Sequence, residues 1–171
     1  MKNKFKFLLI IITLFIFIVY IKTYNKAGNI NLNDGVYTNK YFNISLVEPN
    51  DFYIDKDFSC KYINSSEINL FKMVSNLSYE KGIILATAHK LKGNLEEFID
   101  LEFKYNKKNM TNVSNIKKEG KYMTYEYKNN KWNSKDFIYE KRGYAKKIVI
   151  SYKYKKDKDY YLHNINLISG N

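Results

Sequence analysis

Residues 121–155 read KYMTYEYKNNKWNSKDFIYEKRGYAKKIVISYKYK, and this stretch decides the fold. In three successive runs, every second residue is apolar or aromatic, as in strands that pack one face against a core. The residues that share a face within each run are Met123, Tyr125 and Tyr127; Phe137 and Tyr139; and Ile148, Ile150, Tyr152 and Tyr154. The pairs Asn129–Asn130 and Arg142–Gly143 separate the runs and are residue types that favour turns. The sequence therefore predicts a three-stranded antiparallel meander.

A helix is predicted directly upstream, over residues 95–105. Asn94 is a favoured N-cap residue, and Glu96 and Glu97 place negative charge in the first turn, where it complements the helix dipole. Side chains three and four positions apart share one side of a helix. The apolar side expected here comprises Leu95, Phe98 and Ile99, with Tyr105 close to it. We expect this helix to cover one face of the sheet.

Further strands are predicted over 82–91 and 41–47, where apolar and β-branched residues recur with strand periodicity. The run 68–74 fits a strand or a helix, and the tail 159–169 fits a helix better than a strand. Together these elements predict a single α+β domain over 36–171, with a mostly antiparallel sheet covered by one or two helices.

The N-terminal segment carries a strong apolar signal: residues 7–21 read FLLIIITLFIFIVYI, without a charge or a helix breaker. A spanning helix needs about 20 apolar residues, and flanking lysines that reach the interface extend a shorter run. We favour an uncleaved signal anchor over a cleaved signal peptide, because Asn25 stands where a small residue would precede a cut after Ala27. A buried soluble helix is the third alternative, although a small domain has too little core to enclose it.

The lysines that flank the apolar run predict its orientation. Lys2, Lys4 and Lys6 precede the run, and an excess of positive charge marks the cytoplasmic side. The expected organisation is a cytoplasmic N-terminus (1–6), a transmembrane signal anchor (7–21), a linker (22–35) and an extracytoplasmic domain (36–171) in the cell membrane.

Composition limits the classes of function. The chain of 171 residues has 29 basic and 17 acidic side chains, a formal net charge of +12, but only one of the basic residues is Arg. Because Arg is the residue suited to bidentate contacts with phosphate and guanine, we expect no nucleic-acid partner. A single Cys forms no intramolecular disulfide.

The order of elements resembles that of the PsbP-like family of small extracytoplasmic α/β domains, which are widespread in bacteria as membrane-tethered proteins. The resemblance rests on the segment from Tyr37 to Pro49, the helix start from Asn94 to Phe98, and the last strand with Leu162, Ile165, Leu167 and Ile168. Phe52 stands where the family often has Trp shortly after the proline. The resemblance implies a sheet covered by helices and a role as an accessory or binding subunit, and it transfers no active residue.

No catalytic motif is present. The sequence has no HExxH, GxSxG, P-loop or GxGxxG, and His89 and His163 lie in different predicted elements. We therefore expect no metal, no cofactor and no enzymatic activity. An enzyme of unrecognised type remains an alternative, and it requires Cys60 and a histidine such as His89 to meet in one pocket.

Aromatic and cationic residues alternate along the meander, and such surfaces stack on sugars and attract anions. The candidate ligand-binding residues are Tyr125, Tyr127, Trp132, Tyr152, Lys153, Tyr154 and Lys155. The alternative is that these tyrosines are ordinary strand residues that pack their rings. The predicted function is a membrane-anchored, non-catalytic binding or accessory module with a protein partner or, alternatively, an anionic cell-envelope polymer or lipid head group as its ligand.

Overall fold

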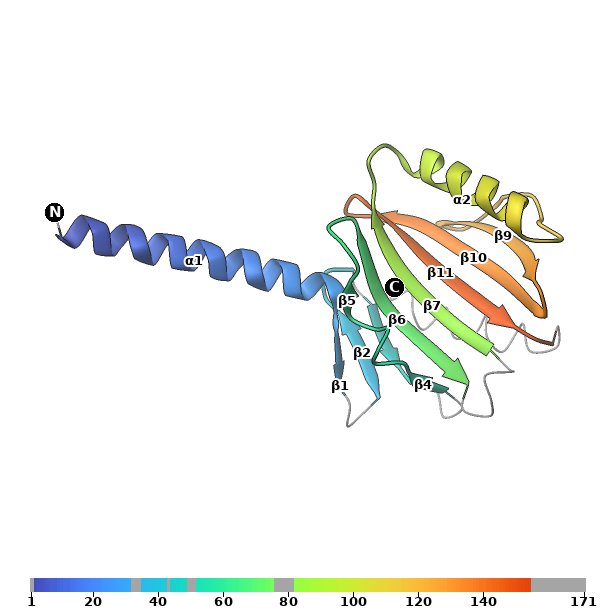
Figure 1. Ribbon diagram of the computed structural model, residues 1–171, viewed down its shortest axis with the longest axis horizontal. Coiled ribbons are helices and arrows are strands. Elements are labelled where there is room, and N and C mark those ends of the chain that lie inside the picture. The colour runs from blue at the N-terminus through green and yellow to red at the C-terminus, as the bar shows by residue number, and fades with distance from the viewer. Residues whose placement is uncertain (1, 32–34, 43, 49–51, 76–81, 155–171) are drawn as a thin grey trace.

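The computed structural model describes residues 2–31, 35–42, 44–48, 52–75 and 82–154 (Figure 1). The helices in this part of the chain are α1 (Lys2–Ala27) and α2 (Leu95–Asn109). The strands are β1 (Asn29–Asn31), β2 (Val36–Asn39), β3 (Ile44–Val47), β4 (Phe52–Ile54), β5 (Lys61–Tyr62), β6 (Glu67–Ser75), β7 (Gly82–Lys90), β8 (Lys117–Glu119), β9 (Tyr122–Asn129), β10 (Trp132–Lys141) and β11 (Tyr144–Tyr152). The tail 159–169 and Lys155 lie outside the described residues.

The large sheet contains the predicted meander. Its strand order is β4-β6-β7-β11-β10-β9-β8, with β5 also paired to β6, and every described pairing is antiparallel. The hairpin between β10 and β11 turns at Arg142 and Gly143, whose φ angles are 55° and 73°. Two consecutive positive φ angles are typical of the type I′ turn, which matches the twist of the flanking strands. The predicted α+β class, the mostly antiparallel sheet and this turn are confirmed.

The ambiguous run 68–74 forms part of a strand, β6, which pairs on either side with β4, β5 and β7. Its register against β7 shifts between Asn69 and Phe71. The extra residue at Leu70 explains why the alternation of buried and half-buried positions is broken, since a bulge places neighbouring side chains on the same face. Periodicity alone did not identify this strand because of that irregularity.

A three-stranded sheet, β1-β2-β3, packs against one face of the large sheet. The core between the two sheets includes an aromatic pair, Tyr37 on β2 and Phe71 on β6, whose ring centroids are 5.0 Å apart. The sequence predicted helices as the covering elements and did not predict this second sheet. The expected linker 22–35 also differs in the structure, because α1 continues to Ala27 and β1 pairs with β2.

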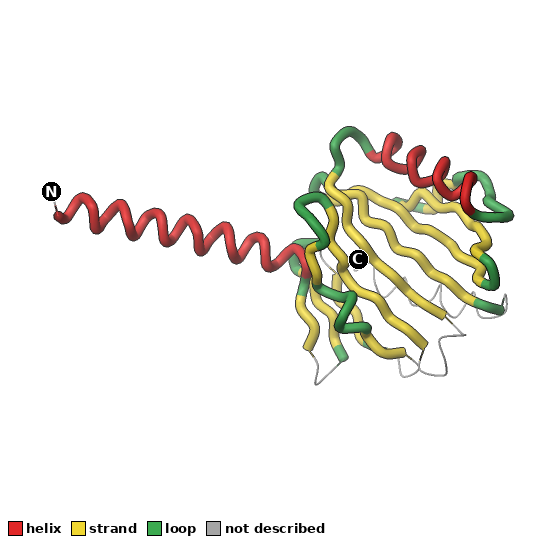
Figure 2. The backbone as a smooth tube through the Cα atoms, viewed as in Figure 1, coloured by secondary structure: helices red, strands yellow, loops and turns green. Residues whose placement is uncertain are grey.

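The opposite face of the large sheet is partly covered by α2 (Figure 2). The N-cap prediction is confirmed, because the backbone N–H of Glu97 donates to Oδ1 of Asn94 over 2.8 Å. The buried positions of the helix are Ile99 and Asn106, whereas Tyr105 is 62% exposed. The expected place of Tyr105 near the apolar side is therefore wrong. A seven-residue spacing returns to the same side of a helix, so Asn106, not Tyr105, follows Ile99 onto the sheet.

Helix α1 points away from the domain (Figures 1 and 2). Its large apolar side chains between Phe7 and Val19 are all exposed, on every side of the helix. Of the helices that the described residues form, none combines the length and apolarity that a membrane crossing requires.

Candidate functional site

The candidate ligand-binding residues lie on both faces of the large sheet, so they do not form one surface. Tyr125 is buried and Tyr127 half-buried on the face that α2 covers, with ring centroids 5.9 Å apart, and strand alternation puts Trp132 on the same face. Tyr152 is buried in the core on the opposite face. Lys153 is half-buried, and Tyr154 is exposed beside it.

A cluster of polar side chains lies between α2 and the sheet. We define the polar cluster as Glu102, Asn106, Tyr125, Asp136 and Lys147. Lys147 pairs with Glu102 of the helix, and its Nζ also lies 3.2 Å from Oδ2 of Asp136 on β10. Asn106 donates from Nδ2 to the hydroxyl of Tyr125 over 2.8 Å. The cluster therefore joins α2 to the sheet through two separate polar contacts.

Asp136 is the unusual member of the polar cluster because its side chain is fully buried. Neither of its carboxylate oxygens accepts a hydrogen bond of normal geometry from the described residues, so its burial is offset by the nearby charge of Lys147 and by the hydroxyls of Tyr125 and Tyr127, which also favour the charged form. Burial raises the pKa of Asp136, whereas the charge of Lys147 acts in the opposite direction. The carboxylates of Asp136 and Glu102 raise the pKa of Lys147 despite its own burial.

A pocket of about 260 Å³ lies beside the N-terminus of α2. We call it the α2 pocket, and its polar lining includes Glu67, His89, Asn94 and Glu97. The His89 ring packs against Phe98 with a centroid distance of 5.3 Å, and its Nε2 lies 2.9 Å from the hydroxyl of Thr87. Burial lowers the pKa of His89. The pocket thus combines an apolar wall with carboxylates and a largely neutral imidazole, which suits hydrogen bonding to a small polar ligand.

Cys60 lies elsewhere, in a second pocket of about 410 Å³ at the end of α1, together with Ala27, Ser59 and Tyr62. Burial raises the pKa of its thiol to about 11, which disfavours the reactive thiolate. Cys60 packs toward the core between the two sheets, whereas His89 lies on the α2 side. The two residues therefore do not form the nucleophile and base that the enzyme alternative requires.

Asp55, in the acidic segment after β4, has local structural partners. Asp55 pairs with Lys72 over 2.7 Å, and its other oxygen accepts backbone N–H donors from Asp57 and Phe58. Within the described ranges, no group of three or more His, Cys, Asp or Glu side chains is arranged to hold a metal ion.

Sequence reasoning missed Lys146, which is fully buried in the core between the sheets. Its Nζ donates to the hydroxyl of Tyr139 and lies 5.7 Å from the centroid of the Phe42 ring. Burial lowers the pKa of Lys146 to about 7, with smaller contributions from Lys141 and Lys121. The available signal was its position, because Lys146 occupies the same strand phase as the apolar residues Ile148 and Ile150.

Comparison with known proteins shows a weak likeness in fold. No family model matches the chain, and no curated protein matches it in sequence. The structure is similar to the solution structure of cyanobacterial PsbP from Synechocystis sp. PCC 6803, with 10% identity and a TM-score of 0.45. The match covers 82% of this chain and 89% of that protein. The structural comparison thus also finds the weak PsbP-like resemblance expected from the sequence.

Proposed function

We propose that this chain is a membrane-anchored, extracytoplasmic binding or accessory module in which α1 is the single-pass anchor. The observation that supports the proposal is the exposure of apolar side chains around all of α1 between Phe7 and Val19. Exposed apolar area of this kind is costly in water and favourable in hydrocarbon. The one polar side chain within that run, Thr13, donates its hydroxyl to the carbonyl oxygen of Leu9 over 2.8 Å, so it too is satisfied inside the helix.

The end of α1 is fastened to the domain. The hydroxyl of Tyr37 donates to the carbonyl oxygen of Ala27 over 3.2 Å, and Nδ2 of Asn39 donates to that of Lys26 over 2.8 Å. These are carbonyl groups that the last turn of a helix leaves without partners. A domain held this closely to α1 would stay beside the membrane surface, as an accessory module at a membrane requires.

Binding is favoured over catalysis because the chemically reactive groups of the described residues are separated. Cys60 and His89 line different pockets, and the α2 pocket offers hydrogen-bonding groups without an activated nucleophile. The α2 pocket is our candidate binding site for a small ligand or for a side chain of a protein partner.

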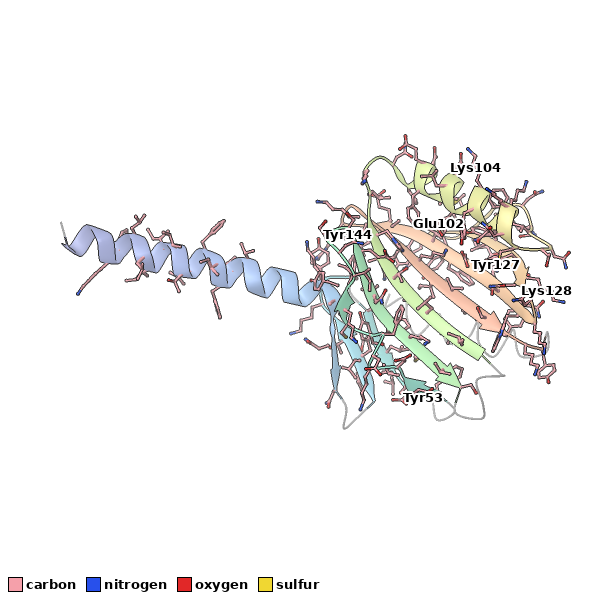
Figure 3. All side chains as sticks on the ribbon, viewed as in Figure 1. Tyr53, Glu102, Lys104, Tyr127, Lys128 and Tyr144 are labelled. Carbon is pink, nitrogen blue, oxygen red and sulfur yellow. The ribbon has the colours of Figure 1, made fainter. Side chains whose placement is uncertain are left out.

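An anionic cell-envelope polymer is the second candidate ligand, and the arrangement of four lysines favours it. Residues Thr111 and Lys128 pair through both backbone hydrogen bonds, at 2.9 and 2.7 Å, which brings the end of α2 beside β9. We define the basic end as the exposed lysines on these elements and on the adjoining hairpin, namely Lys107, Lys108, Lys128 and Lys131. Lys128 lies on the side of the domain away from α1 (Figure 3).

Charged substitutions in α1 test the anchor. Ile12 and Ile16 are 48% and 62% exposed, and Leu101 on α2 is 69% exposed, so Leu101 provides a control of similar exposure. Each charge placed near the middle of a spanning helix costs about 3 kcal/mol. The double variant Ile12→Asp/Ile16→Asp should move the full chain from the membrane fraction to the soluble fraction after an alkaline wash, and Leu101→Asp should not. Retention of the double variant in the membrane would contradict the anchor.

Protease treatment of intact cells tests the orientation, because an extracytoplasmic domain is accessible from outside. Digestion of residues after 35 in intact cells supports the proposed topology. Protection of these residues until the cells are opened would place the domain on the cytoplasmic side and would reject the proposed topology.

Sedimentation with isolated cell-envelope polymer across a salt series tests the second candidate. Electrostatic binding weakens as salt screens the lysines. Lys128→Gln/Lys131→Gln should reduce the bound fraction at low salt, whereas Lys56→Gln/Lys61→Gln removes the same charge elsewhere and should not. An equal loss of the bound fraction in both variants would show that the basic end is not the binding site.

A further inference from the structure

Several loops of the domain meet at the end from which α1 leaves (Figure 2). The backbone N–H of Lys90 donates to the carbonyl oxygen of Ser66 over 2.6 Å, and that of Leu91 donates to the carbonyl oxygen of Gly143 over 3.0 Å. Lys26, in the last turn of α1, donates from Nζ to the hydroxyl of Tyr144 over 3.3 Å. The loop between β5 and β6, the segment after β7 and the β10–β11 turn therefore lie together around the end of α1.

Cations and tyrosine rings alternate on this end. We define the junction surface as Lys26, Lys40, Tyr41, Tyr62, Ile63 and Arg142. The guanidinium carbon of Arg142 lies 4.9 Å from the centroid of the Tyr41 ring, and Nζ of Lys26, a residue of α1, lies 5.4 Å from the same centroid. Tyr62 lies against the backbone of Lys26 and Ala27. The surface is thus continuous with the last turn of α1.

The junction surface is open to solvent and is not neutralised within the described residues. Tyr62 is 40% exposed and Ile63 54% exposed, and Lys40 and Arg142 are exposed. The ion pairs between described residues hold lysines outside this surface, namely Lys72, Lys135 and Lys147. Glu67, which follows the β5–β6 loop, lines the α2 pocket beside His89. A net positive charge therefore remains beside exposed aromatic and aliphatic groups.

This combination fits the headgroup layer of a bilayer. Tyrosine rings are enriched at membrane interfaces, and lysine or arginine near the surface gains about 1 kcal/mol each from anionic lipids. The guanidinium of Arg142 also matches phosphate in geometry. We infer that the junction surface rests on the bilayer and binds the phosphate of anionic phospholipid headgroups, an inference that builds on the proposed insertion of α1.

The test uses the full-length chain reconstituted into lipid nanodiscs of phosphatidylcholine alone or of phosphatidylcholine with phosphatidylglycerol. Lipid that binds the folded domain raises its thermal unfolding temperature by mass action. We expect a higher unfolding temperature with phosphatidylglycerol at low salt, and loss of the difference at high salt.

Two double variants locate the binding surface. Arg142→Asn/Lys40→Gln removes two positive charges from the junction surface, and Asn is suited to the positive φ of 55° at position 142. Lys117→Gln/Lys118→Gln removes two charges from β8, at the far edge of the large sheet. The first variant should lose most of the stabilisation by phosphatidylglycerol, and the second should keep it.

The outcomes separate this inference from the proposed anchor. Failure of the wild-type chain to enter nanodiscs would reject the anchor and the inference together. Entry into nanodiscs with the same unfolding temperature in both lipids would reject the inference and leave the anchor in place. Equal losses in the two double variants would show an effect of overall charge and would also overturn the inference.

Discussion

Asn39 donates a hydrogen bond from Nδ2 to the carbonyl oxygen of Lys26 over 2.8 Å and so joins the small sheet to the last turn of α1. The same Nδ2 also donates to the hydroxyl of Tyr37 over 3.0 Å, and Oδ1 accepts the backbone N–H of Phe42 over 2.9 Å. Asn39 is only 1% exposed. The side-chain amide of Asn39 therefore supplies a hydrogen-bond partner to the carbonyl oxygen of Lys26, to the hydroxyl of Tyr37 and to the backbone N–H of Phe42.

Asn39→Ala should lower the free energy of unfolding by about 3 kcal/mol, because it leaves several buried polar groups without partners. Urea unfolding of the full chain in a mild detergent measures the loss. The control is Asn109→Ala, which removes an exposed hydrogen bond of 2.8 Å to the carbonyl oxygen of Tyr105 and should cost less than about 0.5 kcal/mol. Similar losses in both variants would show that Asn39 has no special role at the junction.

Lys147→Met should destabilise the domain by about 3–5 kcal/mol, because it leaves the carboxylate of Asp136 buried without its counter-ion. Without Lys147 the pKa of Asp136 rises further, so the folded variant holds a proton that the unfolded chain releases. Compared with a variant that also lacks the Asp136 carboxylate, Lys147→Met should therefore gain stability as the pH falls toward the unfolded Asp pKa of about 4.

The double variant Lys147→Met/Asp136→Asn supplies the control for this prediction. It removes both charges, so it should recover part of the lost stability and should not gain stability from Asp136 protonation at acidic pH. Urea unfolding at several pH values measures both effects. A loss in the double variant as large as the sum of the two single losses would show that Asp136 and Lys147 are not coupled.

The elements best predicted from sequence are those whose signal is local. The alternation in 121–155 and the two turns predicted β9, β10 and β11, and the N-cap at Asn94 predicted the start of α2. The strand predicted over 41–47 contains β3 (Ile44–Val47), but its place in a small sheet was missed because the short strands of that sheet pack against residues far along the chain, as Tyr37 does against Phe71. The composition of 22–35 likewise did not indicate that Tyr37 and Asn39 donate hydrogen bonds to the last carbonyl groups of α1.

The candidate site was less predictable because it depends on the face of the large sheet on which each side chain lies. Alternation showed which residues share a face within one strand but did not relate the faces of different strands, so it did not show that Tyr125 and Tyr152 lie on opposite faces of the sheet. Asp136 and Lys146 each stand two positions before an isoleucine, Ile138 and Ile148, and residues two apart on a strand share a face. This position was the available signal that the two charged side chains are buried. Their partners come from other elements, and only the fold brings them together.

His89 should make stability fall in mildly acidic solution. Burial lowers its pKa in the folded state, so the unfolded chain binds the proton more readily. The stabilising contribution is complete above the unfolded pKa of about 6.5 and is lost as the pH falls through the lower folded pKa. The His89 ring resonance, assigned by its disappearance in His89→Gln, should titrate with a midpoint below that value. A midpoint at or above it would contradict the burial of His89 beside Phe98.

Lys146 should change the stability of the domain above about pH 7, whereas the effect of His89 lies in mildly acidic solution. Its folded pKa of about 7 lies below the unfolded value of about 10.4, so the unfolded chain binds more protons between these limits. Stability should therefore rise by about 1 kcal/mol per pH unit from about pH 7 to about pH 8, below the unfolded pKa values of Cys60, about 8.5, and of the tyrosines, about 10. Lys146→Met keeps the length of the side chain and should abolish the rise, as measured by urea unfolding at fixed ionic strength. If wild type and Lys146→Met show the same slope, the amine of Lys146 is protonated in the folded domain, and its burial against Tyr139 and Phe42 must be offset by a negative charge.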